Sequence, residues 1–458
     1  MAVTSPATRP VALRAKVRLA QAAGALSRLA GRGGTSLPGK LLLALDPHAV
    51  GRLATELTGG SAVISATNGK TTTAALAATI LERSGRRPVY NRAGANMAGG
   101  IAGALLQRGR ETDIGLFEID EFWLDGLVAE LRPRVLLLGN LFRDQLDRYG
   151  EIETIAARWA AMAQAATSTT LVINADDPFV AGLGGADRVI YGIEDPDVAA
   201  AGDDHAADAK RCRRCGAAYV YDRIFLGHLG HYHCDACGAG RPAPEVTATG
   251  ISLDGLAGSS FTLNSAQGSC RVQLPLPGLY NVYNALGAAA LTLTLGASLE
   301  QVAAGIAATP PAFGRGEIVT VGGRELLLLL VKNPAGANEV LRTVALEDGP
   351  LRILAVLNDR IADGRDISWI WDADYELLAG RQIRVVCSGD RADELALRLK
   401  YAGFDPQNIV VERELGPALD RVLALPGAGR VIALPTYTAM LALRELLVDR
   451  GAARESFA

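Results

Sequence analysis

The chain has 458 residues, of which 49% are hydrophobic and 21% charged, and its formal net charge is −3. That length can supply two or three domains, each with its own core. The slightly acidic balance gives no reason to expect a polyanion-binding surface, and no long uncharged apolar run predicts a membrane-spanning helix.

The N-terminal stretch 9–32, RPVALRAKVRLAQAAGALSRLAGR, predicts a helix with basic residues on its surface. It lacks the compact apolar core and cleavage site of a signal peptide, so we expect a cytoplasmic protein. Residues 1–60 are expected to form a helical segment that leads into the first strand.

Residues 61–73, SAVISATNGKTTT, predict a phosphate-binding loop between a strand and a helix. Backbone N–H groups and the helix N-terminus would face the phosphates. Lys70 would reach the β- and γ-phosphate oxygens, and the Thr71 hydroxyl can ligate magnesium. The general P-loop pattern requires glycine where Ile64 stands, so this chain does not match it. The residues expected to bind the nucleotide here are Thr67, Asn68, Gly69, Lys70, Thr71 and Thr72.

Further buried strands are predicted at 113–120, 134–140 and 169–176, separated by segments of helix length. This βαβ rhythm is typical of a parallel sheet covered by helices, and the fold class is therefore α/β. A second alternation of strands and helices follows residue 312. We place a nucleotide-binding domain at 61–312 and a smaller Rossmann-like α/β domain at 313–458.

The segment at about 205–242 interrupts the first alternation and contains four cysteines in two CxxC pairs, eighteen residues apart. This spacing predicts a closed, structural zinc ribbon inserted into the first domain. A disulfide pair is the alternative, which a reducing cytosol disfavours. Three histidines between the pairs are alternative ligands but are more simply bystanders, and Cys270 and Cys387 are expected to be buried. The predicted zinc ligands are Cys212, Cys215, Cys234 and Cys237, and the three histidines are His228, His231 and His233.

Several of these motifs resemble those of the Mur ligases, whose tighter loop G-T-x-G-K-T-[ST] the chain matches with Ala66 at the first glycine. Alanine fits there if its backbone φ is negative. The resemblance implies ATP and Mg²⁺ as cofactors, with Glu118 as a magnesium ligand at a strand end, where a hard cation needs carboxylate oxygen. Asp120 and Glu121, which follow Glu118, are better suited to a solvated acidic turn.

Other Mur ligase landmarks lie further along the chain. NLFRDQLDRYG (140–150) carries Gln145 where many members have a metal-binding histidine, which puts a second metal in doubt. NADDP (174–178) has two aspartates that could organise a loop. The helix LYNVYNALGAAA (279–290) offers Asn281 and Asn284 to the adenine, although helix capping is the competing role for Asn281. FGRGE (313–317) supplies Arg315, which the resemblance implies on the nucleotide at the domain hinge.

Two differences from typical Mur ligases indicate which family within this group the chain resembles. Only residues 1–60 precede the loop, too few for the domain with which typical Mur ligases bind a uridine nucleotide, and their D-Y-A-H-N-P segment reads LLVKNP at 329–334. The chain resembles the MurT family, the ligase subunits of lipid II isoglutaminyl synthase. The resemblance rests on the four-cysteine insert and on three further segments, VKNPAGANEVL, LNDRIADGRDISWIWDADYE and LPTYTAML.

That resemblance implies ATP-dependent amidation of the D-glutamate α-carboxylate in the lipid II stem peptide, through an acyl phosphate, to D-isoglutamine. Lys70 and magnesium would neutralise charge on the transferred phosphoryl group. The reaction belongs to peptidoglycan biosynthesis, at the inner face of the cell membrane. Ammonia would come from a separate glutaminase, GatD, bound to the C-terminal domain.

In that family an aspartate of the ligase subunit is understood to complete the partner's Cys–His pair, where a carboxylate would orient the imidazole. The stretch ADGRDISWIWD favours Asp366, then Asp363, with Asp359 and Asp372 after them. Trp369 and Trp371 are predicted to alternate on a short strand and to anchor the interface or pack in the core.

Two other functions are alternatives for this sequence. A folylpolyglutamate synthase or another peptide-forming Mur ligase would add an amino acid in place of ammonia. A nucleotide-regulated scaffold would keep its partner without catalysis, although the intact Gly69-Lys70-Thr71 and Glu118 argue against it.

Overall fold

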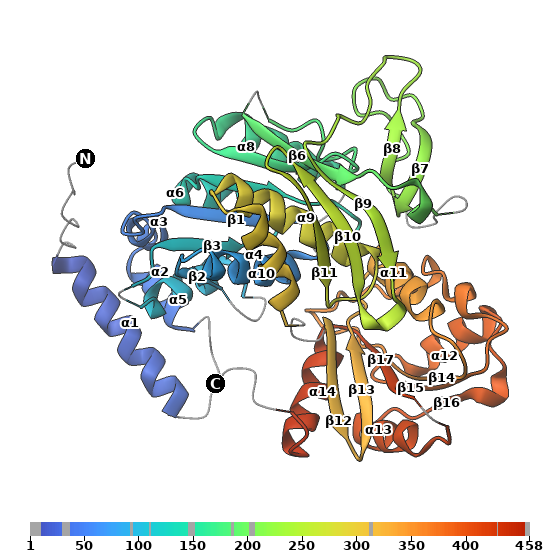
Figure 1. Cartoon of the computed structure of the whole chain (residues 1–458). Coiled ribbons are helices and arrows are strands. Elements are labelled where there is room, and N and C mark those ends of the chain that lie inside the picture. Colours follow the sequence, from blue (N-terminus) through green and yellow to red (C-terminus); the bar gives the residue numbers. More distant parts are fainter. Residues whose placement is uncertain are drawn as a thin grey trace.

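The computed structural model describes residues 11–29, 37–91, 95–109, 111–144, 152–184, 187–200, 207–310, 315–427 and 429–453 (Figure 1). Its strands form a nine-stranded sheet, a six-stranded sheet and a two-stranded hairpin. The predicted α/β fold class is confirmed. The second large sheet begins at Arg315, beside the proposed boundary near residue 312.

The first sheet has the order β11-β10-β9-β6-β5-β4-β1-β3-β2, parallel from β2 to β9 and antiparallel across β9, β10 and β11. Its strands are β1 (Ser61–Ser65), β2 (Pro88–Tyr90), β3 (Ile114–Glu118), β4 (Val135–Leu138), β5 (Thr170–Asn174), β6 (Arg188–Ile193), β9 (Val246–Leu253), β10 (Ser259–Ser265) and β11 (Gly268–Leu274).

Helices cover both faces of this sheet (Figure 1). Alternate residues of β1 point to opposite faces, because Ala62 and Ile64 pack in one core and Val63 in the other. The first core is covered by α4 (Lys70–Arg83), α9 (Leu279–Thr294) and α10 (Leu299–Ala308). The second is covered by α1 (Val11–Leu29), α2 (Leu37–Leu45), α3 (Ala49–Ala54), α5 (Ala98–Gln107), α6 (Leu124–Leu131) and α8 (Ile152–Ala165).

The second sheet has the order β12-β13-β17-β14-β15-β16 and is parallel except at its β12–β13 edge. Its strands are β12 (Arg315–Val321), β13 (Arg324–Leu329), β14 (Leu351–Val356), β15 (Ile383–Ser388), β16 (Ile409–Val411) and β17 (Val431–Pro435). Its helices are α11 (Pro334–Ala345), α12 (Ala392–Tyr401), α13 (Leu415–Ala424) and α14 (Tyr437–Asp449).

The inserted module is the hairpin of β7 (Val220–Leu226) and β8 (Leu229–His233), which projects from the first domain (Figure 1). Short 3₁₀ helices complete the described chain at Pro196–Val198, Gly255–Ala257, Ser368–Trp371, Tyr375–Leu378 and Pro406–Asn408. Within the described residues, every helix is too short or too polar to cross a bilayer.

The strand order places a binding crevice at one edge of the first sheet. β1 lies between β3 and β4, so the chain leaves β1 toward one side and later returns on the other. Ligands of open α/β sheets bind at the carboxyl ends of the strands beside such a switch point. Ile64 of β1 is in register with Glu118 of β3, which brings that carboxylate next to the predicted phosphate loop.

Candidate active site

A cavity of about 300 Å³ lies at this switch point, between the first domain and the second. The first domain lines it with the phosphate loop, the end of β3 and the α9 side chain of Asn284. The second domain contributes the segment that ends β13 and begins α11. The cavity walls contain the predicted residues Thr67, Asn68, Gly69, Lys70, Thr71, Thr72, Glu118 and Asn284.

The phosphate loop has the backbone that the sequence predicts. Gly69 has φ 89° immediately before α4, and a Cβ there would lie 1.9 Å from Asn284 Oδ1, so only glycine fits. Ala66 is not among the described residues with positive φ, which explains why alanine replaces glycine at that position. The loop is tied to the end of β4, because Asn68 N donates to Asn140 Oδ1 at 2.9 Å.

Lys70 lies among carboxylates at the base of the loop. Its Nζ donates to Glu121 Oε2 at 2.7 Å and to the Ala66 carbonyl; the Lys70 side chain is buried and that of Glu121 is nearly buried. Burial disfavours the ammonium, but Glu121, Asp120 and Glu118 outweigh it and raise the pKa of Lys70. Burial also opposes ionisation of Glu121, but Lys70 and a second lysine overcome it and lower that pKa.

The expectation of a solvated acidic turn at Asp120 and Glu121 is therefore wrong. Asp120 is buried and Glu121 nearly so, and both line the cavity with Glu118. The carboxylates gather there because they follow β3, whose carboxyl end meets that of β1. Such a cluster of carboxylate oxygens beside a Thr71 hydroxyl is the donor set that Mg²⁺ prefers, so the residues fit this ion.

Lys332, the second lysine, comes from the other domain and was not predicted as a site residue. Its Nζ donates to the Thr67 carbonyl at 3.2 Å and forms an ion pair with Asp144. The neighbouring Asn333 exchanges side-chain hydrogen bonds with Asn68 of the phosphate loop, at 3.0 and 3.3 Å. The second domain thus contacts the phosphate loop directly and places a second ammonium group in the cavity.

The two asparagines of α9 differ in position. Asn284 lines the cavity and accepts a hydrogen bond from Thr73 Oγ1 at 3.4 Å. Asn281 is buried behind it, donates to the Pro277 carbonyl and accepts from Asn284 Nδ2 at 3.0 Å. Asn281 does not cap the helix, since the N-cap is Gly278; it orients Asn284.

The two aspartates of NADDP hold a loop and the insert together, which agrees with an organising role. Asp176 accepts from Tyr283 Oη at 2.7 Å and pairs with Arg241 at 2.5 Å. Asp177 accepts from Leu141 N at 2.8 Å and lies 3.3 Å from His228. His228 therefore has a structural partner and lies outside the cysteine cluster.

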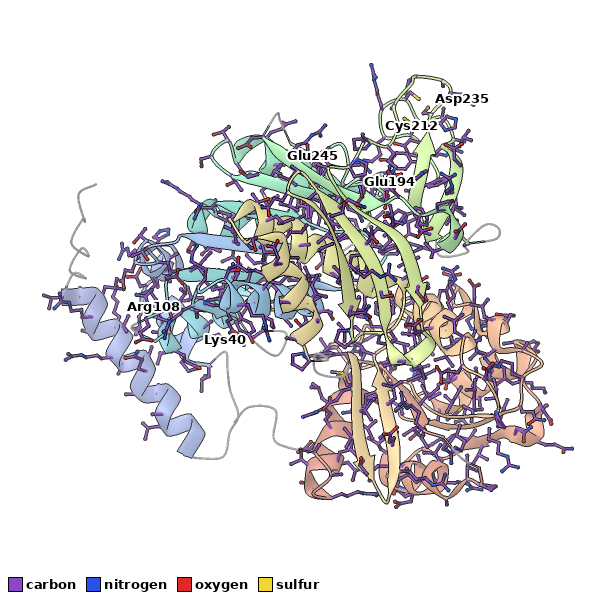
Figure 2. All side chains as sticks on the ribbon, in the orientation of Figure 1. Lys40, Arg108, Glu194, Cys212, Asp235 and Glu245 are labelled. Carbon is purple, nitrogen blue, oxygen red and sulfur yellow. The ribbon has the colours of Figure 1, made fainter. Side chains whose placement is uncertain are left out.

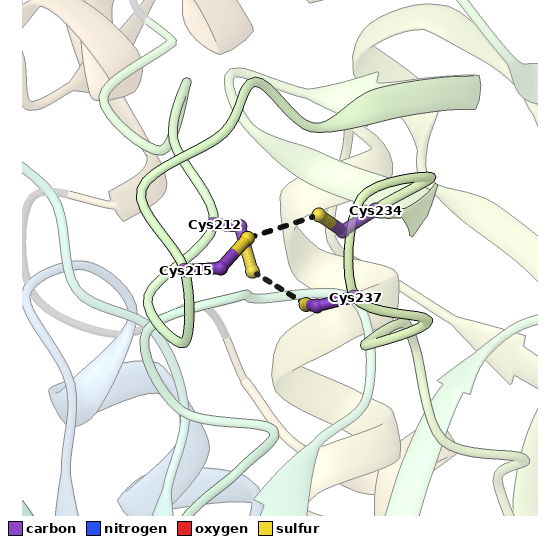
Figure 3. Close-up of side chains that lie close together, drawn as sticks. All are labelled: Cys212, Cys215, Cys234 and Cys237. Atoms are coloured by element: carbon purple, nitrogen blue, oxygen red, sulfur yellow. Dashed lines mark hydrogen bonds between the residues drawn. The ribbon is translucent and has the colours of Figure 1, made fainter.

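The four predicted cysteines converge in the insert, with Cys212 at its outer end (Figures 2 and 3), and none of them lines the cavity. Their sulfur atoms all lie within 4.8 Å of one another. Cys212 Sγ is 3.6 Å from Cys237 Sγ, and Cys215 Sγ is 3.5 Å from Cys234 Sγ. These separations exceed the disulfide bond length of about 2.05 Å. They approach the roughly 3.8 Å edge of a tetrahedron with Zn–S bonds of about 2.3 Å, so the cluster fits Zn²⁺.

The two CxxC turns have the same hydrogen bonds. Gly216 N donates to the Cys212 carbonyl at 2.8 Å, and Gly238 N donates to the Cys234 carbonyl at 2.9 Å. Both glycines have positive φ. Each turn therefore presents two sulfur atoms to one side. Cys387 is buried as predicted, and burial raises the pKa of its thiol to about 12. Cys270 is only partly buried, at the border of the first core, so the prediction of a buried residue is wrong there.

The aspartates in the loop after β14 lie in different environments. Asp363 is buried and accepts from Thr438 N at 2.7 Å, and burial raises its pKa. Asp366 is exposed, and a hydrogen bond from Ser368 N lowers its pKa. Asp359 pairs with Arg391 at 2.8 Å, whereas Asp372 is half-exposed.

The predicted short strand at the two tryptophans is wrong. Ser368–Trp371 is a 3₁₀ helix, so Trp369 and Trp371 do not alternate across a sheet. Trp369 packs against the core of the second domain, while Trp371 is 51% exposed and touches the Tyr401 ring. Two other predictions, Gln145 and the side chain of Arg315, lie outside the described residues.

Comparisons with known proteins agree with these features. Residues 64–214 match the family described as Mur ligase middle domain, and residues 330–440 match the one described as MurT ligase C-terminal. The chain is 34% identical over 434 residues to the MurT subunit of glutamine-hydrolysing lipid II isoglutaminyl synthase from Staphylococcus aureus (strain N315), covering 94% of this chain and 97% of the relative. The subunit of the same name from Streptococcus pneumoniae (strain ATCC BAA-255 / R6) is 33% identical over 435 residues, with 94% and 95% covered.

Solved structures show the same fold at lower identity. A pseudomurein peptide ligase type C from Methanothermus fervidus superposes with a TM-score of 0.68 and 23% identity, over 87% of this chain and 80% of that one. MurF from Acinetobacter baumannii superposes with a TM-score of 0.64 and 18% identity, over 90% and 80%.

Proposed function

The chain belongs to the MurT family of Mur-type, ATP-dependent ligases, and from this membership we propose that it amidates the D-glutamate α-carboxylate of the lipid II stem peptide. The product is D-isoglutamine, formed at the inner face of the membrane during peptidoglycan synthesis. The main support is the cavity in which the phosphate loop, the carboxylates after β3 and Lys332 meet.

We propose two chemical steps. A carboxylate oxygen of the acceptor attacks the γ-phosphorus of ATP, which forms an acyl phosphate and releases ADP. Ammonia then attacks the acyl carbon, phosphate leaves, and the nitrogen loses a proton to give the amide. Activation is needed because a carboxylate oxygen is a poor leaving group until it is phosphorylated.

The residues of the cavity have distinct roles in this proposal. Lys70 carries a positive charge for the phosphates, and its raised pKa keeps it protonated at neutral pH. Glu118 and Thr71 would hold Mg²⁺, which neutralises charge on the transferred phosphoryl group. The loop N–H groups orient the nucleotide, and Asn284 faces its base.

The direct test is to co-express the chain with a candidate glutaminase and to supply lipid II, ATP and magnesium. Amidation replaces a hydroxyl by an amine, so the acceptor should lose about 1 Da by mass spectrometry. ATP should be hydrolysed only when the acceptor is present. Addition of a whole amino acid to the acceptor would identify a peptide-forming ligase instead.

Lys332 is proposed to stabilise the transferred phosphoryl group from the second domain. Lys332→Met should lower amidation by about 10–100-fold, with kcat falling more than KM for ATP rises. The substitution leaves Asp144 without its ion-pair partner. Because burial already raises the pKa of Asp144, this carboxyl can take up a proton, which limits the loss of folding stability. The matched control is Lys400→Met, which removes an exposed lysine of α12 and should leave amidation unchanged. Equal activity of the two variants would remove Lys332 from the mechanism.

The cysteine cluster is proposed to bind Zn²⁺ as a structural ion. We expect Cys212→Ser to release the zinc and to destabilise the insert, because three thiolates no longer close the tetrahedral site. Cys270→Ser, which removes a cysteine outside the cluster, should keep the metal. Elemental analysis of both purified variants provides the measurement, and unchanged zinc in Cys212→Ser would refute the assignment.

The partner is proposed to be a GatD-type glutaminase docked on the second domain, with Asp366 completing its catalytic group. Asp363 accepts a hydrogen bond from Thr438 N and thereby stabilises its own loop. Asp359 forms an ion pair with Arg391. Asp366 is the exposed carboxylate of this loop that a hydrogen bond holds ionised. It can therefore receive an imidazole from a second protein without breaking a contact.

A further inference from the structure

Helix α1 has two opposite apolar stripes, of which only one packs against the protein. The inner stripe of Leu13, Val17, Ala20 and Gly24 is buried. The outer stripe consists of Val11, Ala15, Leu19, Ala22 and Leu26, all exposed. At about 100° per residue the two stripes lie roughly 180° apart.

The outer stripe is too apolar for an ordinary solvent-facing helix surface. Val11, Leu19 and Leu26 are 81%, 55% and 67% exposed. The five residues of the stripe follow one another at spacings of three to four, which aligns them along the helix. In Figure 1, α1 lies along the margin of the first domain with its outer side facing away from the body. The helix is therefore held firmly on one side and presents a continuous apolar stripe on the other.

Basic residues flank this stripe, and α1 contains no acidic residue. Arg14 and Arg18 are exposed along one border, and neither forms an ion pair with a residue that the structure describes. Lys16 lies on the other border, where it pairs with Asp46 at 3.3 Å. The positive charge is a local feature of α1, since the chain as a whole has a net charge of −3. Lys40 is exposed on the body beside α1 and adds positive charge near it, whereas Arg108, which lies there too, is neutralised by an ion pair with Glu56 (Figure 2).

We propose that α1 is an interfacial helix that binds the surface of an anionic phospholipid bilayer. Its outer stripe would enter the boundary between headgroups and acyl chains, and Arg14 and Arg18 would contact the anionic headgroups. A second copy of the chain is the competing occupant, but two α1 helices facing each other would bring four arginines together with no acidic partner on either helix. The charge therefore favours a membrane over a dimer.

This inference depends on the proposed function for its purpose, since a lipid-linked acceptor requires an enzyme held at the bilayer. The binding itself is tested without that acceptor. The full chain is mixed with vesicles of phosphatidylcholine alone or with added phosphatidylglycerol, and co-sedimentation is measured. We expect binding to the anionic vesicles that weakens as salt is raised, and little binding to the neutral ones.

Two double variants separate the apolar and the charged contributions. Leu19→Ser/Leu26→Ser and Arg14→Glu/Arg18→Glu should each lower partitioning about tenfold or more. Leu397→Ser, which removes a similarly exposed leucine from α12, should leave it unchanged. All changed residues are exposed, so the thermal unfolding of every variant should match that of the unchanged chain.

Several results would overturn the inference. One is that the unchanged chain fails to sediment with anionic vesicles. Another is that the double variants sediment with these vesicles as completely as the unchanged chain does. A concentration-dependent dimer that Leu19→Ser/Leu26→Ser abolishes would assign the stripe to a second copy. If the vesicle result holds but lipid II is never amidated, the proposed function fails and the membrane surface stands.

Discussion

Replacing Lys70 by alanine should abolish amidation, with a loss of at least about a thousandfold in kcat/KM. Lys70 is the ammonium of the phosphate loop, and positive charge aimed at a transferred phosphoryl group has effects of this size. ATP consumption should fall with amidation, because both depend on the same transfer. The measurement is acceptor-dependent ADP release together with the mass of the lipid product.

The design must separate catalysis from folding, because Lys70 also neutralises the buried Glu121. Removing one member of such a pair destabilises a protein by leaving the other charge uncompensated. The double variant Lys70→Ala/Glu121→Gln removes both charges and should recover most of the thermal stability that the single variant loses. If it also regains activity, then Lys70 acts only through Glu121, and the phosphate-binding role is wrong.

The same variant distinguishes an enzyme from a scaffold. The second domain carries the proposed docking surface, and Lys70 lies in the first, so partner binding should survive. A nucleotide-regulated scaffold would keep both its partner and its effect on the product when Lys70 is removed. An enzyme keeps the partner and loses the product.

Local sequence patterns predicted the elements around the site well. Apolar strands flanked by a Gly-Lys-Thr loop and by acidic residues are local signals, and β1, β3 and α4 lie where those signals occur. The CxxC spacing likewise predicted a cluster that the fold brings together. In each case the residues that matter are near one another in the chain or share one regular element.

The features that the sequence failed to predict depend on contacts, present or absent, between distant segments. Lys332 meets Thr67 across 265 residues and Asp144 across 188, and no periodicity in the sequence reports such a distance. Glu121 looked solvated because its partner, Lys70, lies 51 residues away. The SWIW stretch contains the aromatic and β-branched residues that strands favour, but it has no neighbouring strand to pair with and folds as a 3₁₀ helix.

Replacing Asp366 by asparagine should separate the two nitrogen sources. Glutamine-driven amidation should fall by about a thousandfold or more, as when a triad carboxylate that orients a histidine becomes an amide. Ammonia-driven amidation should stay within about twofold, because that reaction bypasses the glutaminase. Folding should be unaffected, since asparagine Oδ1 can still accept the Ser368 N–H that Asp366 now accepts. Both reactions are followed on the same complex, with glutamate release measured in parallel.

The neighbouring aspartates provide the comparison that gives this result its meaning. Asp372→Asn changes a half-exposed carboxylate on the same segment and should leave both nitrogen sources intact. Asp363→Asn disturbs a buried group that holds Thr438, so it should lower the melting temperature and reduce both reactions together. Equal loss from both nitrogen sources in Asp366→Asn, without a change in melting temperature, would instead assign this carboxylate to the synthetase reaction. Because the three aspartates differ in burial and in hydrogen bonding, each position predicts a different pair of rates, and only one pattern assigns Asp366 to the partner's glutaminase.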